Sequence, residues 1–112
     1  MKRIEAIVRP HRFEEIVTRL RLIGVTGMTV ADVHGMGPSA SIERVYLGQR
    51  YRTPSAPRYE LTIVVRDDAA AHVVNAIVQA GRTEEPGDGI VTVGDVFDVV
   101  RIRTGESGPE AL

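Results

Sequence analysis

The beginning of the chain changes from the period of a strand to that of a helix and back again. In KRIEAIVRP, residues 2–10, apolar side chains alternate with polar ones and a proline closes the run, which predicts a strand. From His11 to Ile23 the apolar residues recur every three or four positions, which predicts an amphipathic helix that ends before Gly24. The segment TGMTVADVHGMG, residues 26–37, is β-branched and roughly alternating, so it predicts a second strand.

The same order of periods recurs in the second half of the chain. Residues 58–66, RYELTIVVR, alternate and predict a strand, after which Asp67 or Asp68 would cap a helix with an apolar stripe. The run IVTVGDVFDVVRIR, residues 90–103, predicts a long final strand with a bulge or bend at Gly94. The remaining tail, TGESGPEAL, offers little to bury.

Two strand–helix–strand units predict a single α+β domain over residues 1–112, a ferredoxin-like βαββαβ sandwich. Each helical connection makes its two flanking strands parallel, and the two units share one sheet with both helices on one face. The other face would carry Ile7, Val64 and further apolar groups. A domain of this size cannot leave that face in water, so we expect association through it.

Composition removes several classes of function. The net charge is −1, which argues against binding of nucleic acid, and there is no cysteine for disulfides, thiolate metal sites or cysteine catalysis. No apolar run is long enough to cross a membrane, so we expect a cytoplasmic protein without direct membrane insertion. His11, His34 and His72 fall in separate segments, so the sequence predicts neither a metal site nor an enzyme.

Three short motifs suit an anion, although each alone has an ordinary alternative. GMGPSA, residues 35–40, matches G-x-G-x-x-G/A, but no helical stripe follows it to hold a pyrophosphate, which leaves a turn or a backbone anion nest. Gly87 and Gly89 form a second pair that otherwise reads as a turn. Arg101 and Arg103 would share one side of the final strand, where two guanidinium groups suit a phosphate or carboxylate unless they are simply solvated.

The interruption from Pro38 to Pro57 is long for a connection inside a compact domain, and such loops are usually functional or disordered. It is locally basic, and it contains Tyr46 and Tyr51, which suit contact with another protein.

These segments together resemble the P-II signal-transduction proteins over essentially the whole chain. The matching stretches are MKRIEAIVRP, GVTGMTV, HGMG, YLGQRY, YELTIVV, GDG and VVRIRTGE, in the family's order and spacing. The resemblance implies a homotrimer with adenine nucleotides in three clefts between subunits. It also implies a T-loop, at about residues 38–57 between strands two and three, that controls a target protein such as a transporter, enzyme or regulator. A B-loop would span about 82–90 and a C-terminal tail about 104–112.

The resemblance also assigns residues. Those implied in nucleotide binding are Ile7, Thr29, Gly35, Met36, Gly37, Arg58, Val64, Gly87, Asp88, Gly89, Arg101 and Arg103, the last two from a neighbouring subunit. Those implied in the effector loop are Ser39, Tyr46, Arg50, Tyr51 and Arg52, with Tyr51 at the position that is nucleotidylated in many relatives.

Departures from the family pattern point to a changed signal. Ser39 stands where the family has a Gln that helps to hold Mg²⁺ and 2-oxoglutarate, so it puts 2-oxoglutarate sensing in doubt and leaves Mg²⁺ an open question. Arg58 replaces a Lys, and Pro38 and Ile90 replace two cations that face the outer phosphates. Losing them predicts a preference for ADP or AMP less tilted toward ATP. Two alternatives stay open: a P-II-like sensor of bicarbonate, a cyclic nucleotide or another small anion, and a trimeric module that binds metal or serves assembly.

Overall fold

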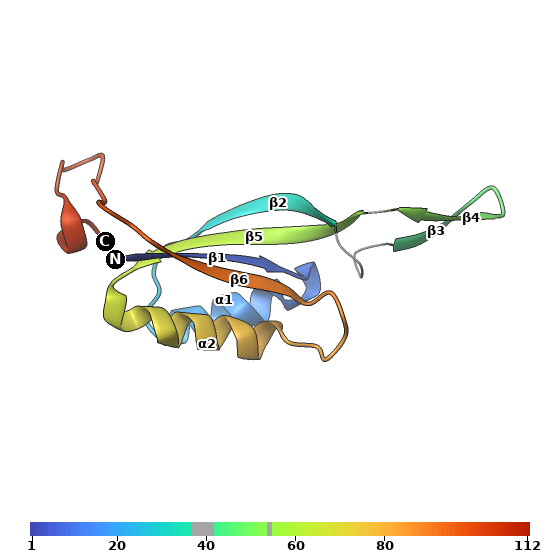
Figure 1. Ribbon diagram of the computed structural model, residues 1–112, viewed down its shortest axis with the longest axis horizontal. Coiled ribbons are helices and arrows are strands. Elements are labelled where there is room, and N and C mark those ends of the chain that lie inside the picture. The colour runs from blue at the N-terminus through green and yellow to red at the C-terminus, as the bar shows by residue number, and fades with distance from the viewer. Residues whose placement is uncertain (37–41, 54) are drawn as a thin grey trace.

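The computed structural model describes residues 1–36, 42–53 and 55–112, without the side chains of residues 42–46 and 50–53. Its α-helices and strands in chain order are β1 (Lys2–Val8), α1 (Phe13–Leu22), β2 (Thr29–Met36), β3 (Ile42–Tyr46), β4 (Gln49–Thr53), β5 (Ser55–Val65), α2 (Ala70–Gly81) and β6 (Gly89–Asp95) (Figure 1). Short 3-10 helices are η1 (Pro10–Arg12), η2 (Asp67–Ala69) and η3 (Gly108–Ala111).

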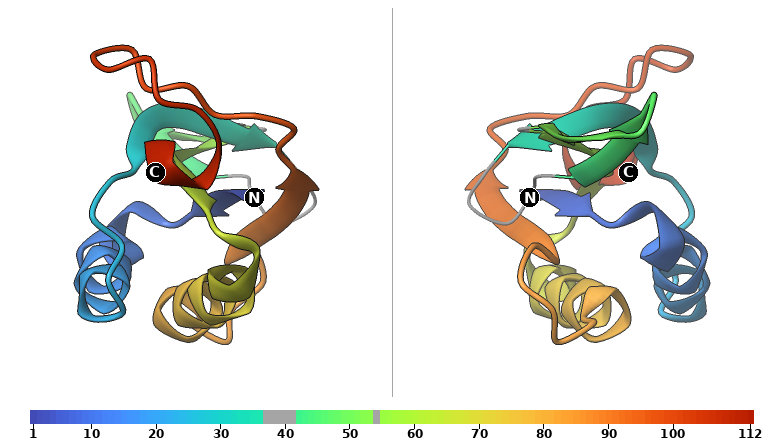
Figure 2. Two further views of the ribbon diagram at one scale, coloured as in Figure 1. Left: turned by 90° about the vertical axis from the view of Figure 1, so that its left-hand side faces the viewer. Right: turned by 90° about the vertical axis from the view of Figure 1, so that its right-hand side faces the viewer.

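The main sheet has four strands in the order β2-β5-β1-β6. Every neighbouring pair is antiparallel, so β1 runs parallel to β2 across β5, and β5 runs parallel to β6 across β1. Both α-helices lie on one side of this sheet (Figures 1 and 2). The predicted ferredoxin-like α+β fold with split strand–helix–strand units is therefore confirmed.

Strand alternation separates a helix-covered face from an open face of the sheet. Ile4 pairs with Ile63 and Ala6 with Leu61, and these side chains join the helices in the core. The buried core comprises Ile4, Ala6, Val8, Ile16, Leu20, Leu61, Ile63, Val73, Ile77 and Ala80. Successive side chains of a strand point to opposite faces. The opposite side of the sheet, called the open face below, therefore carries Ile7, Thr29, Gly35, Arg58 and Val64.

The helix starts differ from the prediction. Helix α1 follows the single turn η1, and it ends as predicted before Gly24, which has φ of 95°. Helix α2 follows the single turn η2. No side chain caps the start of η2 or of α2, so the predicted cap by Asp67 or Asp68 is wrong. The Asp67 carboxylate instead pairs with the backbone amine of Met1, at 2.7 Å between N and Oδ1. This carboxylate is therefore engaged outside the helix.

The predicted loop of residues 38–57 contains a hairpin. Strands β3 and β4 form a separate two-stranded sheet, in which Tyr46 pairs with Gln49. Leu47 and Gly48 between them have φ of 51° and 78°, the positive values of a tight two-residue hairpin turn. Strand β5 begins at Ser55, so it starts before the predicted position at residue 58.

The predicted long final strand over residues 90–103 is wrong beyond Asp95. Strand β6 pairs with β1 up to the register Lys2–Asp95, where β1 itself begins. Farther on, the β-pairing of the described backbone is reduced to an isolated bridge between Val100 and Ser107. Arg101 and Arg103 consequently do not lie on a strand, and their predicted placement on one side of it is also wrong.

The tail buries more than its composition predicts. Its last turn, η3, lies beyond the end of the sheet at which β1 begins (Figures 1 and 2). Ala111 in this turn is 8% exposed. The expectation of a tail with little to bury is therefore wrong, because backbone carbonyls and a small side chain dock it.

Candidate functional site

The 82–90 loop leads into strand β6 through two glycines. At both positions the backbone conformation is one that other residues do not adopt easily. Gly87 has φ of 95° and Gly89 has φ of 110°, both in a region that side chains disfavour. Gly89 pairs with Val8 at the end of β1. A Cβ atom at Gly89 would lie 1.7 Å from the carbonyl oxygen of Ile7, so the absence of a side chain lets the two backbones approach.

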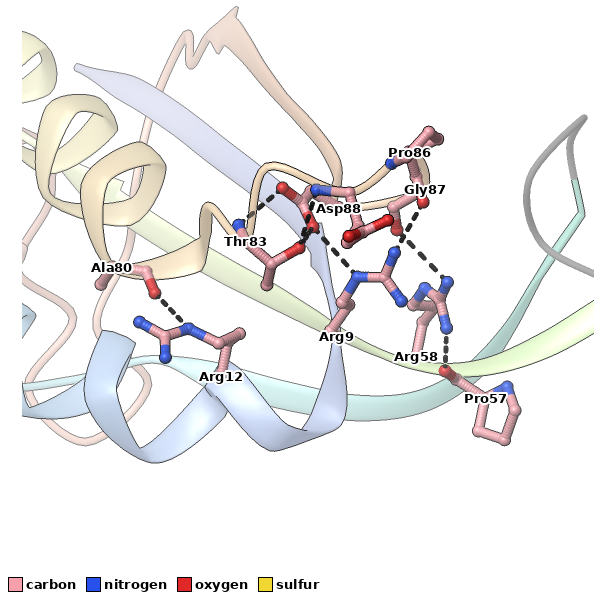
Figure 3. A network of polar contacts seen from close by, with 10 residues as sticks. Arg9, Arg12, Pro57, Arg58, Ala80, Thr83, Pro86, Gly87 and Asp88 are labelled. Atoms are coloured by element: carbon pink, nitrogen blue, oxygen red, sulfur yellow. Dashed lines mark hydrogen bonds and ion pairs between the residues drawn. The ribbon is translucent and has the colours of Figure 1, made fainter.

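Asp88 fixes this loop with a carboxylate that points inward, as Figure 3 shows. Its Oδ2 accepts a hydrogen bond from the backbone N–H of Thr83 at 2.7 Å, and its Oδ1 accepts one from the Thr83 hydroxyl. The Arg9 Nε also donates to Oδ1 at 3.0 Å, while the Arg9 Nη2 donates to the carbonyl of Pro86 at 2.6 Å. These contacts join both ends of the loop to the residue that follows β1.

The contacts shift the acidity of Asp88. Burial raises the pKa of this carboxyl, but the hydroxyl and backbone N–H of Thr83, together with the Arg9 guanidinium, outweigh burial and lower the pKa to about 2. The carboxylate is therefore charged throughout the neutral and mildly acidic range.

We expect this shift to appear as an acid-dependent loss of stability. A carboxyl with a lowered folded-state pKa stabilises the fold above its unfolded value and loses that contribution as the pH falls from about 4 to about 2. The loss is about 2 kcal/mol at most, and less because the Asp88 side chain is 25% exposed. Urea unfolding at pH 7 and pH 2.5 should show a smaller acid effect in Asp88→Asn than in the original protein.

The exposed carboxylate of Asp32 provides the matched control for this measurement. Asp32→Asn should keep the full acid dependence. An equal dependence in the original protein and in Asp88→Asn would mean that the contacts of Asp88 do not persist in solution.

Arg58 connects strand β5 to the 82–90 loop. Arg58 is 9% exposed, and among the described residues it is the charged residue that is buried. The guanidinium donates from Nη1 to the carbonyl of Pro57 at 2.8 Å and from Nη2 to the carbonyl of Gly87 at 3.2 Å (Figure 3). Burial, and then repulsion from Arg9, lower its pKa, whereas Asp88 raises it. Two guanidinium groups thus share the neighbourhood of one carboxylate.

Gly35 provides the space for the stem of Arg58. A Cβ atom at Gly35 would lie 3.3 Å from the Cγ of Arg58, which is tighter than normal van der Waals contact. Gly35 pairs with Ala56 on the neighbouring strand. The glycine at the end of β2 therefore belongs structurally with Arg58 and the 82–90 loop.

A cavity of about 820 Å³ lies farther along the same strands. Thr29 and Val64, which the resemblance implies in nucleotide binding, both line it, together with Leu112 of the tail. Thr29 is about six residues from Gly35 along β2, or about 20 Å. The structure thus brings the predicted residues together as two groups on the open face.

The other predicted residues are placed as follows. Ile7 lines a smaller cavity of about 280 Å³ with Asp88 and Gly89. Met36 is 75% exposed at the end of β2. Arg103 is exposed after β6, whereas Arg101 contacts the tail.

The effector-loop predictions fall in the least described part of the chain. Gly37 and Ser39 lie outside the described residues. Tyr46 lies on β3, and Arg50, Tyr51 and Arg52 lie on β4. Backbone pairing places Tyr51 opposite Arg44.

Arg9 and Thr83 are site residues that the sequence did not reveal. The contact of Arg9 with Asp88 depends on the pairing of β1 with β6, which brings together residues 79 positions apart, whereas Thr83 lies five positions before Asp88 in the same loop. A usable signal was the pairing register, because Val8 opposite Gly89 places Arg9 beside Asp88.

The described residues also bear on metal sites and on membrane spans. Residues 1–36, 42–53 and 55–112 contain no group of three or more His, Asp or Glu side chains placed to hold a metal ion. No helix in this part of the chain is long and apolar enough to span a membrane.

Comparison with known proteins gives one consistent result. A family model described as nitrogen regulatory protein P-II matches residues 1–106. Nitrogen regulatory protein P-II 1 of Methanothermobacter thermautotrophicus is 43% identical over 112 residues, which are 100% of this chain and 97% of that protein. The nitrogen regulatory proteins P-II of Microchaete diplosiphon and Cereibacter sphaeroides are 40% and 38% identical, each over 100% of both chains.

Proposed function

Because this chain belongs to the P-II family of nitrogen regulatory proteins, we propose that it is a non-enzymatic regulator that binds adenine nucleotides. The nucleotides occupy clefts between the subunits of a homotrimer. The segment of residues 38–57 acts as the T-loop and contacts a target protein. The family relationship supports the regulatory role, and the arrangement of the open face supports the class of ligand.

The observation that carries the ligand class is the position of two residue groups on one face. Thr29 and Val64 line a large, mainly apolar-walled cavity, which suits a flat base. Gly35 and Arg58 adjoin the Gly87 carbonyl and the glycine turn of the 82–90 loop, where backbone groups can approach an anion. One chain therefore offers a site for a base and, about 20 Å away, a site for an anion, so a nucleotide between subunits would take the base site of one chain and the anion site of its neighbour.

Exposed apolar side chains support self-association. Ile90 on β6 is exposed, and Phe97 and Ile102 in the following segment are fully exposed. Ile7 and Val64 add to the same open face. A second copy of the chain that covers these groups would remove them from water and would bring Arg101 and Arg103 to a neighbouring cleft.

Regulation in this proposal is a shift of population. A nucleotide that binds one arrangement of the T-loop more tightly increases the share of that arrangement, and the target protein binds or leaves accordingly. A nucleotide of equal affinity for both arrangements would have no effect on the target.

We expect ADP to bind about as tightly as ATP with Mg²⁺. Ile90 supplies no charge at a position next to the glycine turn, so the additional phosphate of ATP gains little attraction. Calorimetric titration of the trimer should show affinities within tenfold of each other, or about 1.4 kcal/mol. Ile90→Lys should shift the preference toward ATP, whereas the uncharged control Ile90→Gln should not. A preference for ATP beyond tenfold in the original protein would contradict this expectation.

A second candidate function, sensing of a small anion such as bicarbonate, is favoured by Arg9 and Arg58. These two guanidinium groups share one carboxylate, Asp88, and each lowers the cost of placing another negative charge nearby. The same titrations with sodium bicarbonate at constant ionic strength separate the candidates. Binding of bicarbonate without binding of ADP would favour the small-anion sensor.

A further inference from the structure

After β6 the chain folds back on itself, so that residues 105–108 contact residues 99–101. The backbone N–H of Arg101 donates to the carbonyl of Glu106 at 2.8 Å, and that of Gly105 donates to the carbonyl of Arg101 at 2.8 Å. The backbone N–H of Gly108 donates to the carbonyl of Val99 at 2.9 Å. These bonds form a closed turn, so the direction in which the tail leaves it is defined.

Two arginines then hold the last turn of the tail. Arg66, at the end of β5, donates from Nη2 to the carbonyl of Pro109 at 3.2 Å. Arg101 donates from Nη2 to the backbone oxygens of Ala111 and Leu112, both at 3.2 Å. The Ala111 side chain is 8% exposed, so this turn is docked on the protein.

The docked turn lies at the cavity that carries Thr29 and Val64. Leu112 is one of the residues that line this cavity of about 820 Å³. Figure 1 shows the last turn of the tail beyond the end of the sheet, and Leu112 lines the cavity together with residues at the end of β5. Leu112 of the tail thus forms part of the wall of the cavity that the proposed function gives to the adenine base.

The contacts of Arg101 conflict with its proposed role in phosphate binding. A guanidinium group offers two bidentate edges to an anion, Nε with Nη2 and Nη1 with Nη2, and both include Nη2. In this structure Nη2 of Arg101 is engaged by Ala111 and Leu112. A bidentate contact with phosphate therefore requires Arg101 to release the tail.

We propose that residues 108–112 form a displaceable cover that competes with adenine nucleotide for Arg101, beside the Thr29–Val64 cavity. This inference rests on the proposed function, and it adds an intramolecular competitor to that site. In this docked state, called closed below, Nη2 of Arg101 is engaged by the tail, and a bidentate contact with phosphate requires the tail to leave. The apparent affinity for nucleotide falls in proportion to the fraction of molecules that are closed.

The test compares ADP binding by four forms of the full trimer in calorimetry. Ala111→Gln places a large neutral side chain where a small one is buried, and a chain that ends after Ser107 removes the cover. Glu110→Gln introduces the same residue at the neighbouring exposed position and is the matched control. If nine molecules in ten are closed, both disrupting variants should bind ADP about tenfold more tightly than the original protein and the control.

Other outcomes overturn the inference and separate it from the proposed function. Equal ADP affinity in all four forms, or weaker binding without the tail, would refute the cover and leave nucleotide binding intact. Absence of ADP binding in every form would refute both. Hydrogen–deuterium exchange of the original protein adds a direct reading: ADP should speed exchange of the amides of residues 108–112, and slower exchange would show a clamp on the nucleotide instead.

Discussion

The Gly89→Ala variant is expected to lose about 3 kcal/mol of unfolding free energy. The added methyl carbon would lie 1.7 Å from the Ile7 carbonyl oxygen and 2.8 Å from the Ile7 carbonyl carbon, both backbone atoms that no side-chain rotation can move. The φ of 110° at this position adds strain for any residue with a Cβ atom. To relieve the clash with the Ile7 carbonyl, β1 and β6 must separate at the end of the pair that lies next to Asp88.

Equilibrium unfolding in urea measures this loss, and Gly94→Ala is the matched control. Gly94 lies on the same strand, and a Cβ atom there meets nothing within 4 Å. Its replacement should change the unfolding free energy by about 0.5 kcal/mol or less. Similar midpoints for the two variants would show that β6 does not approach Ile7 as closely as the structure has it. The Gly89 variant should also bind ADP more weakly, because Asp88 and the 82–90 loop move with the strand.

The core of this fold is predictable because each strand and helix buries one face. Ile4 and Ala6 on β1, and Leu61 and Ile63 on β5, recur at every second position, and this period leaves little choice of register. Where an element lacks a buried face, the period carries no information. Strands β3 and β4 belong to a separate two-stranded sheet, so the sequence presented them as part of an interruption.

The end of the final strand shows a second limit of local pattern. Residues 96–103 are β-branched and alternating, which favours a strand, but a strand also needs a neighbour to bond. The register of β6 with β1 stops at Lys2–Asp95. Alternation within a segment cannot reveal that its neighbour has ended, and the placement of Arg101 and Arg103 failed for that reason.

The site was predictable in its glycines and only partly in its polar contacts. Gly87 and Gly89 mark a turn by composition alone, and their positive φ values agree with that interpretation. The contact of Asp88 with Arg9 could not be read from the loop alone, because Arg9 is 79 residues away, although Thr83 lies only five residues before Asp88. Arg58 was predicted to be a cation for a ligand, whereas in this structure its guanidinium serves two carbonyls of its own chain.

The Arg58→Ala variant is expected to lose about 2 kcal/mol of unfolding free energy. Truncation removes a buried stem that packs beside Gly35 and leaves the carbonyls of Pro57 and Gly87 without their donor. Arg58→Lys keeps the charge and most of the stem but lacks the planar fork, so it should recover only part of the loss. Replacing the exposed Arg21 on α1 with alanine is the control, with an expected change of about 0.5 kcal/mol or less.

Urea unfolding gives these values, and hydrogen–deuterium exchange locates them. In Arg58→Ala the amides of the 82–90 loop should exchange faster, while those of α1 should not change. The sign of the stability change decides between two roles for Arg58. If the guanidinium is mainly a structural link, its removal destabilises the protein. If it is mainly held for an external anion, its removal relieves the repulsion from Arg9 and stabilises the protein without ligand, and that result would favour the small-anion sensor.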